Sequence, residues 1–193
     1  MNREALPRRV VVTGFGAVTP LGMNTEQSWA AMMDYRLGYR YYDKSAVGIQ
    51  SRFLGVIDDE PDLKGVPAAI RRRLPRFARL ALGAAREAME MAFHGESPAA
   101  YYDLLECGTI IGSGWAGQDE IQNNHEDFLR AGLGSPFGCF LSMPNVATAA
   151  CSLFWGLRGY QNSPFAACAT GTIAIGVAFE VIRSGCLLYT SRR

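Results

Sequence analysis

The chain has 193 residues, of which 49% are hydrophobic and 19% are charged, and its formal net charge is +1. This length fits one domain with its own core, and the composition excludes a disordered chain. The small net charge provides no long-range attraction for polyanions, so we expect no nucleic-acid partner.

Hydrophobic periodicity and turn residues predict alternating strands and helices. In chain order they are a strand at 10–13, a helix from Asn24 or Thr25 to about Met33, a strand at 52–57, a helix at 75–93, a strand at 109–111, helices at 118–130 and 143–155, a very short strand at 165–167 and a helix at 169–183. This order predicts an α/β protein with several parallel strand pairs, built as one compact unit.

Gly14 and Gly16 follow the first predicted strand, as the glycines of a dinucleotide-binding motif do. Thr19 stands where the third glycine belongs, and Pro20 and Gly22 delay the next helix. Because a pyrophosphate needs a helix N-terminus close behind the glycines, the favoured interpretation is a simple turn after the strand. A nucleotide-dependent oxidoreductase is the weaker alternative.

A cluster of arginines begins the helix predicted at 75–93. It consists of Arg71, Arg72, Arg73, Arg76 and Arg79. The ordinary interpretation is a solvated helix start, and the sharper one is a docking patch for an acidic partner.

Between residues 131 and 179 the only charged residue is Arg158, so a membrane-spanning element has to be considered. Prolines, glycines and asparagines interrupt this stretch too often for a helix exposed to lipid. We therefore expect a segment buried in protein or in a subunit interface, and no contact with a membrane.

The cysteines are Cys107, Cys139, Cys151, Cys168 and Cys186, and no two of them form a C-x-x-C pair. With only two histidines, His94 and His125, the sequence predicts no metal site, and we expect no cofactor. Free cysteines and an N-terminus without an apolar segment indicate a cytoplasmic protein.

Cys168 lies between the last predicted strand and the last predicted helix, among small residues that include Ala169. A helix N-terminus offers free N–H groups and a partial positive charge, which favour a thiolate and an anionic intermediate. The small neighbours let a substrate carbonyl approach the backbone. The alternative is a buried structural cysteine, the role that Cys107 and Cys151 suggest.

Several segments resemble the β-ketoacyl-acyl-carrier-protein synthases, and the synthase II type and related polyketide ketosynthases most of all. They are the opening at 10–16 with 19–22 (Thr-Pro-Leu-Gly), the basic helix entry at 73–81, Gly-Ser-Gly at 112–114 with Asn124 and His125, Trp-Gly-Leu-Arg-Gly at 155–159, and Ala-Cys-Ala-Thr-Gly at 167–171. The order and spacing of these segments make the resemblance specific, and it covers residues 8 to about 185.

The resemblance implies an α/β, thiolase-like fold, in which this chain is the N-terminal βα lobe of a layered α-β-α-β-α condensing enzyme. It implies a homodimer and a decarboxylative Claisen condensation between an acyl thioester on Cys168 and malonyl-acyl-carrier protein. The Cys168 N–H then forms half of the oxyanion hole, and Arg72, Arg73 and Arg76 receive the carrier protein.

Trp115 follows the Gly-Ser-Gly segment where the family has an aliphatic side chain that lines the acyl pocket. The larger indole predicts a shortened pocket and short acyl primers. The alternative is that the indole turns outward into a dimer interface.

The chain departs from the family's pattern in three ways: its length, its missing catalytic partners and its last residues. The family's proteins are roughly twice this length. Their catalytic histidines, lysine and gating loop lie in the second half, and none of them is matched here. We therefore expect residues 1–185 to form the N-terminal domain, nearly inactive in condensation by itself, and residues 186–193 to be an atypical, non-native tail. A non-catalytic chain-length partner subunit is the main alternative, although such subunits lack the cysteine.

Overall fold

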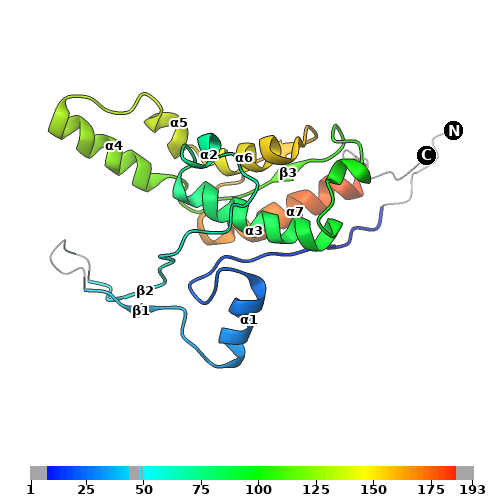
Figure 1. Ribbon diagram of the computed structural model, residues 1–193, viewed down its shortest axis with the longest axis horizontal. Helices are drawn as coiled ribbons and strands as arrows, with labels where there is room; N and C mark the ends of the chain where they lie inside the picture. Colours follow the sequence, from blue (N-terminus) through cyan, green and yellow to red (C-terminus); the bar gives the residue numbers. More distant parts are fainter. Residues whose placement is uncertain (1–7, 44–47, 49, 186–193) are drawn as a thin grey trace.

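The computed structural model describes residues 8–43, 48 and 50–185, and Figure 1 shows their arrangement. The α-helices are α1 (Thr25–Met33), α2 (Ala68–Arg71), α3 (Arg76–Phe93), α4 (Gln118–Ala131), α5 (Gly138–Ser142), α6 (Val146–Trp155) and α7 (Thr170–Arg183). Two short 3₁₀ helices, η2 (Pro98–Ala100) and η3 (Ala167–Ala169), precede β3 and α7.

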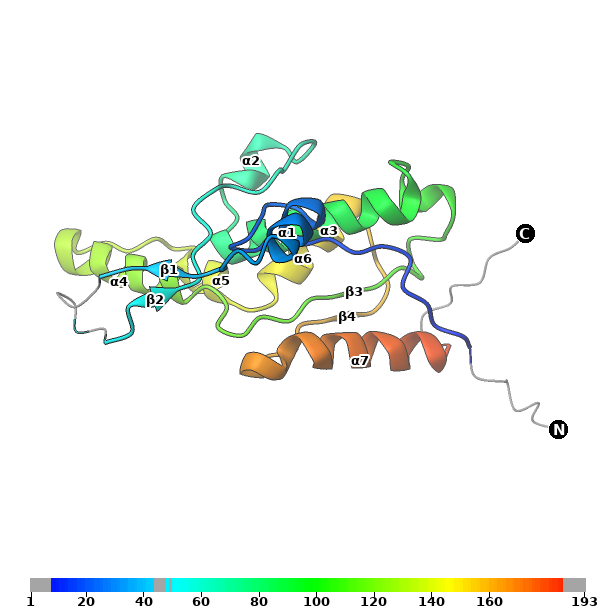
Figure 2. The same ribbon diagram turned by 90° about the horizontal axis from the view of Figure 1, so that it is seen from below.

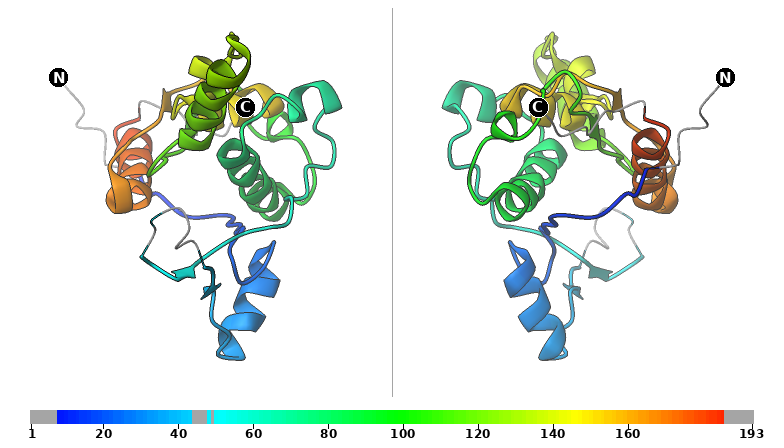
Figure 3. Two further views of the ribbon diagram at one scale, coloured as in Figure 1. Left: turned by 90° about the vertical axis from the view of Figure 1, so that its left-hand side faces the viewer. Right: turned by 90° about the vertical axis from the view of Figure 1, so that its right-hand side faces the viewer.

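Four short strands form two separate pairs. β1 (Arg40–Tyr41) and β2 (Phe53–Leu54) pair antiparallel, whereas β3 (Thr109–Ile110) and β4 (Gln161–Asn162) pair in parallel. Backbone bonds from Ile111 to Asn162 and from Ser113 to Pro164 prolong the parallel pair. α3 and α6 lie on one face of this pair and α7 on the other, which gives three layers (Figure 2). Figure 3 shows α1 projecting away from these layers.

The ends of the predicted helices are confirmed to within a few residues. Asn24 caps α1, because its Oδ1 accepts a bond of 2.8 Å from the N–H of Gln27. α3 starts after Pro75 and stops where His94 and Gly95 both adopt positive φ angles, as expected for a left-handed helix stop.

The core lies between α3 and α6. Leu82 of α3 and Cys151 of α6 are 0% and 2% exposed, and they pack with Leu63 and Val66. The other face of α6 is polar: Thr148 is buried, with its Oγ1 3.3 Å from the carbonyl of Ile111, beside β3. This single helix therefore joins the apolar core to the parallel strands.

Residues 10–13 are not a strand within the described chain, so this prediction is wrong there. The segment instead continues across α3, where Gly14 and Gly16 lie directly on the helix backbone. A Cβ at either position would overlap a carbonyl oxygen, that of Ala88 or Ala84. Glu87 of α3 holds the following turn by accepting bonds of 2.9 Å from the N–H groups of Ala17 and Thr25. The close packing on α3 explains why positions 14 and 16 are glycine, and a nucleotide site is not needed to explain them.

Two further expectations need correction. The strand predicted at 165–167 is displaced to β4, and the residues before α7 form a turn. In the uncharged stretch at 131–179 the buried residues are mainly those at 147, 148 and 150–152 of α6, whereas Leu133 and Phe140 outside this helix and Leu153 within it are more than 60% exposed. Within the ranges that the structure describes, no helix has the length and apolarity to cross a bilayer.

The contact between Gly16 and α3 predicts a stability difference between two glycines. Gly16→Ala should lower the free energy of unfolding by about 1–3 kcal/mol, because the new methyl group overlaps Ala84. Gly176→Ala in α7, where nothing lies within 4 Å of the added Cβ, should raise it by about 0.5–1 kcal/mol. Urea unfolding measures both, and equal effects at the two positions would contradict the described packing.

Candidate active site

Cys168 is the middle residue of η3, two residues before the first residue of α7, and its side chain is exposed. The predicted position at the entry of a helix is therefore confirmed. The thiol follows an irregular connection of residues 163–167, whose last residue begins η3, rather than the end of a strand. This turn leads from β4 to η3 and α7, and the thiol that follows it is at the surface.

The turn before Cys168 contains a strained residue. Ala167 has a φ of +47°, a left-handed conformation that costs an alanine on the order of 1 kcal/mol. Thr170 stabilises this conformation, because its Oγ1 accepts a bond of 2.8 Å from the N–H of Ala166. Thr170 is only 4% exposed, so this bond is protected from water. Thr170 stands in the Ala-Cys-Ala-Thr-Gly segment, but no local signal in the sequence marks it as the residue that supports the turn.

The loop after β3 packs against this turn. Gly112 lies on the methyl group of Thr170, and an added Cβ would overlap it. A Cβ on Gly114 would lie 3.4 Å from the carbonyl oxygen of Ala167. Trp115 comes next in the chain and is 71% exposed. The structure thus brings the predicted residues 115 and 168 onto two adjoining segments.

The first turn of α7 is free of competing charge. It contains no acidic residue, and no side chain caps it. The N–H groups of Ala169 and Thr170 already donate to the carbonyls of Ala166 and Ala167, so the remaining contribution is that of the helix dipole, which favours an anion at this end. Ala169, the N-cap residue, adds only a methyl group beside Cys168. This end of α7 therefore favours negative charge on a bound carbonyl oxygen.

Two of the other described cysteines, Cys107 and Cys151, are buried and so differ from Cys168. Burial raises the pKa of the Cys151 thiol to about 12. Burial, with the carboxylates of Asp103 and Glu106, also raises the pKa of Cys107. Both thiols remain protonated at neutral pH, as expected for core residues, while Cys139 is exposed on α5. Cys186 lies outside the described residues.

The arginine cluster divides into two groups. Arg76 and Arg79 bind the carboxylate of Glu60 at 2.7 and 3.2 Å. Arg72 and Arg73 are exposed, and no ion pair or side-chain hydrogen bond engages them within the described ranges. The predicted docking residues therefore differ in their pairing: Arg76 is bound to Glu60, whereas Arg72 and Arg73 keep unpaired charges.

The two histidines lie away from the segments that surround Cys168. His94 forms the C-terminal stop of α3, and His125 lies on α4, where it lines a separate pocket with Cys139. Neither histidine is positioned by the turn or loop around Cys168. Among the described residues, the segments around Cys168 thus hold an exposed thiol and a helix N-terminus but no histidine.

The role of Thr170 can be tested with two complementary variants. Thr170→Val keeps the packing against Gly112 and removes the acceptor for the Ala166 N–H. We expect alkylation of Cys168 to change about fivefold, since one net hydrogen bond contributes about 1 kcal/mol. Thr170→Ser keeps the acceptor and should retain the wild-type rate while losing thermal stability. Wild-type reactivity in Thr170→Val would contradict the positioning role.

Comparison with known proteins places this geometry in a family. The profile of the β-ketoacyl synthase N-terminal domain matches residues 7–187. The 3-oxoacyl-[acyl-carrier-protein] synthase 2 of Synechocystis sp. is 29% identical over 181 residues, which cover 92% of this chain and 43% of that protein. The enzyme of the same name from Staphylococcus aureus (strain COL) is 31% identical, with the same coverage. The chain thus spans less than half the length of these curated relatives.

Solved structures agree with the sequence comparison. A β-ketoacyl synthase from Burkholderia phymatum superposes with a TM-score of 0.73 at 25% identity, over 91% of this chain and 43% of that chain. The ishigamide ketosynthase/chain length factor gives 0.74 at 26% identity, over 93% and 45%. These neighbours confirm the predicted N-terminal lobe of a thiolase-like condensing enzyme. The chain therefore belongs to the β-ketoacyl synthase family and comprises its N-terminal domain.

Proposed function

We propose that Cys168 is the acyl-accepting nucleophile of a β-ketoacyl-acyl-carrier-protein synthase that acts in fatty acid or polyketide synthesis. The observation that supports this role most directly is the exposed thiol at the entry of α7, next to the strained Ala167. The buried Thr170 supports that turn from below.

The first half-reaction is a transfer of the acyl group between two thiols. The Cys168 thiolate attacks the carbonyl carbon of the acyl thioester, and the carbonyl oxygen becomes an oxyanion. The Cys168 N–H and the N-terminus of α7 stabilise this charge. Collapse of the tetrahedral intermediate expels the carrier thiolate, which takes up a proton, and leaves the acyl group on Cys168.

The second half-reaction forms the carbon–carbon bond. Malonyl-acyl-carrier protein loses carbon dioxide, and the resulting carbanion attacks the carbonyl carbon of the Cys168 thioester. The bond to sulfur breaks, the Cys168 thiolate is regenerated, and a β-ketoacyl chain remains on the carrier. General acid–base groups contribute on the order of 10²–10⁴ to rates of this kind. The described residues place none beside Cys168, so we propose that this chain by itself is acylated but condenses poorly.

The partners follow from the same proposal. An acyl carrier protein delivers both thioesters, and the unpaired arginines at 71–73 are its electrostatic contact. We further propose a homodimer that acts in the cytoplasm. A non-catalytic chain-length subunit is the rival assignment, and the test below distinguishes the two.

Reactivity of Cys168 provides that test. With limiting iodoacetamide at pH 8, mass mapping of the folded chain should find the label first at Cys168. Cys151 should stay unlabelled, because a pKa of about 12 leaves almost no thiolate at that pH. Incubation with an acyl-acyl-carrier protein should add one acyl group, and Cys168→Ser should abolish this addition. Faster labelling of Cys139, or the absence of any acyl adduct, would support the non-catalytic rival instead.

Trp115 provides a second test, on the choice of acyl group. The loop that carries it lies against the turn at Ala167, so we propose that the indole borders the acyl site and restricts it to short primers. Trp115→Ala should increase acylation by a long-chain acyl carrier about tenfold and leave short-chain acylation within twofold, since relieved overpacking amounts to about 1–3 kcal/mol. Equal use of long chains by the wild type and Trp115→Ala would refute the restriction.

A further inference from the structure

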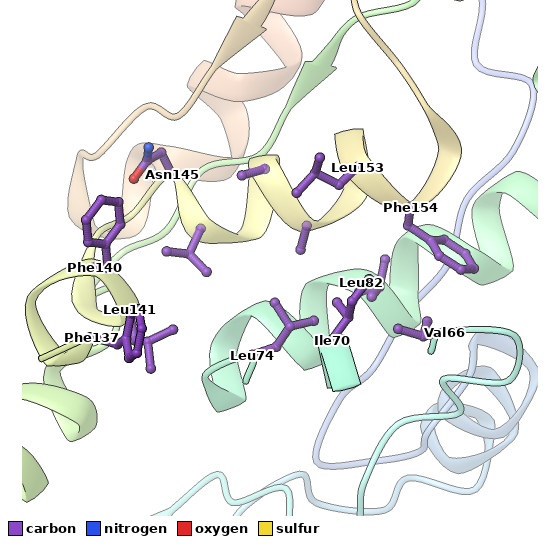
Figure 4. A pocket seen from close by; sticks show the side chains of 13 residues that line it. Val66, Ile70, Leu74, Leu82, Phe137, Phe140, Leu141, Asn145, Leu153 and Phe154 are labelled. Carbon is purple, nitrogen blue, oxygen red and sulfur yellow. The ribbon is translucent and has the colours of Figure 1, made fainter. Parts of the chain in front are cut away.

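The face of α6 that lies toward the parallel strands carries two buried hydroxyl groups. They belong to Thr148 and Ser152, which stand one helical turn apart and are 2% and 7% exposed. The opposite face is apolar, and its Leu153 and Phe154 line a cavity of about 390 Å³ together with Leu82 of α3 (Figure 4). Because burial of a hydroxyl group costs free energy unless the group is hydrogen-bonded, its partners indicate what it does.

The hydroxyl group of Thr148 lies where the two parallel strands end. Its Oγ1 is 3.3 Å from the carbonyl oxygen of Ile111, which follows β3, and 3.4 Å from that of Asn162, the last residue of β4. A third neighbour, the Oγ of Ser163, lies at 2.7 Å. Since carbonyl oxygens only accept hydrogen bonds, the Thr148 hydroxyl group donates toward them and accepts from Ser163. One side chain of α6 thus binds the ends of both strands.

Ser152 makes bonds of the same kind, but with residues that precede the end of β4. Its Oγ donates to the carbonyl oxygen of Leu157 at 2.6 Å and accepts a bond of 2.7 Å from the side-chain amide of Gln161. These partners belong to the connection between α6 and β4 and to the first residue of that strand. Of the two buried hydroxyl groups, that of Thr148 is therefore the one that contacts the strand ends nearer to Cys168 in the chain.

The ends of β3 and β4 lead directly into the segments that surround Cys168. The end of β3 continues into the loop whose Gly112 lies on the methyl group of Thr170. The end of β4 continues into the connection that leads to η3. A backbone bond of 3.3 Å from the N–H of Ser113 to the carbonyl of Pro164 still joins the two segments there. The separation of the strand ends therefore determines how the loop and the connection meet beside the thiol.

We infer that Thr148 is a positioning residue for Cys168, because its hydroxyl group holds the ends of β3 and β4 at the separation that the segments around the thiol require. Packing by itself does not require this hydroxyl group, since valine has the same branched shape. A fully bonded polar group in a core specifies one geometry. The effect on acyl transfer rests on the proposed function, whereas the effect on the thiol rests on the described contacts alone.

Four variants isolate the hydroxyl group at the strand ends. Thr148→Val removes it and keeps the branched shape, whereas Thr148→Ser keeps it and removes the methyl group. Ser152→Ala is the matched control, because it removes a buried hydroxyl group from the same helix whose partners precede the end of β4. Ser163→Ala removes the second hydroxyl group of the pair at a less buried position, so it tests the inference even if Thr148→Val does not fold.

The measurement is the rate of acylation of the chain by an acyl-acyl-carrier protein at increasing carrier concentration. In Thr148→Val the maximal rate should fall about tenfold, because buried hydrogen bonds are lost, and the half-saturating concentration should stay within twofold. Thr148→Ser should keep the wild-type rate within twofold despite a lower melting temperature. Ser163→Ala should lose at least threefold in rate, since half of the pair remains. Ser152→Ala should lower the melting temperature and leave the rate unchanged.

The opposite results separate this inference from the proposed function. If Thr148→Val and Ser163→Ala keep the wild-type rate, or if Ser152→Ala loses as much rate as they do, the Thr148 hydroxyl group contributes only to stability and the inference is overturned. If the wild type is not acylated at all, the proposed function fails. Alkylation of Cys168 by iodoacetamide, which needs no carrier, then decides the inference. A rate in Thr148→Val that differs at least threefold from those of the wild type and Ser152→Ala supports it, and equal rates overturn it.

Discussion

The arrangement around Cys168 depends on the buried side chain of Thr170. Its methyl group supports Gly112, and its hydroxyl group accepts the bond from Ala166. One residue thereby joins the loop after β3 to the turn before α7. Because Gly112 has no side chain, the loop lies directly on the methyl group of Thr170, and a Cβ on Gly114 would lie 3.4 Å from the carbonyl oxygen of Ala167. A larger residue at position 112 would overlap Thr170 and push the loop away from the turn that carries the thiol.

Ion pairs neutralise only part of the arginine cluster at 71–79. Five arginines stand within nine residues, yet Glu60 binds two of them and leaves the charge at 71–73 free. Exposed ion pairs contribute little to stability, so the main effect of Glu60 is to determine which arginines keep an unpaired positive charge. That charge borders an apolar cavity on the opposite side of the β3–β4 pair from α7. The exposed thiol of Cys168 and the unpaired positive charge thus lie in different layers of the same domain.

Local signals in the sequence predicted most of the helices. The apolar residues three or four positions apart at 75–93, the cap at Asn24 and the position of Cys168 before a helix all depend on neighbours in the chain. Strand predictions at 10–13 and 165–167 were less successful, since a strand requires a distant partner that its own residues do not specify. For the same reason, the ion pair of Arg76 and the support from Thr170 could not be predicted from the sequence. Both depend on tertiary contacts, and no local sequence pattern marks the residues that make them.

The outer surface of α7 has a consequence for biosynthesis. Ile173, Ile175 and Phe179 remain exposed although the helix is well formed. Ribosomes add about 5–20 residues per second, so a polypeptide as long as the curated relatives needs on the order of ten seconds or more beyond this domain. Throughout that interval these apolar side chains of α7 would stay uncovered. Transiently exposed apolar surface of this kind makes incompletely assembled chains prone to aggregate, which is why cells need chaperones.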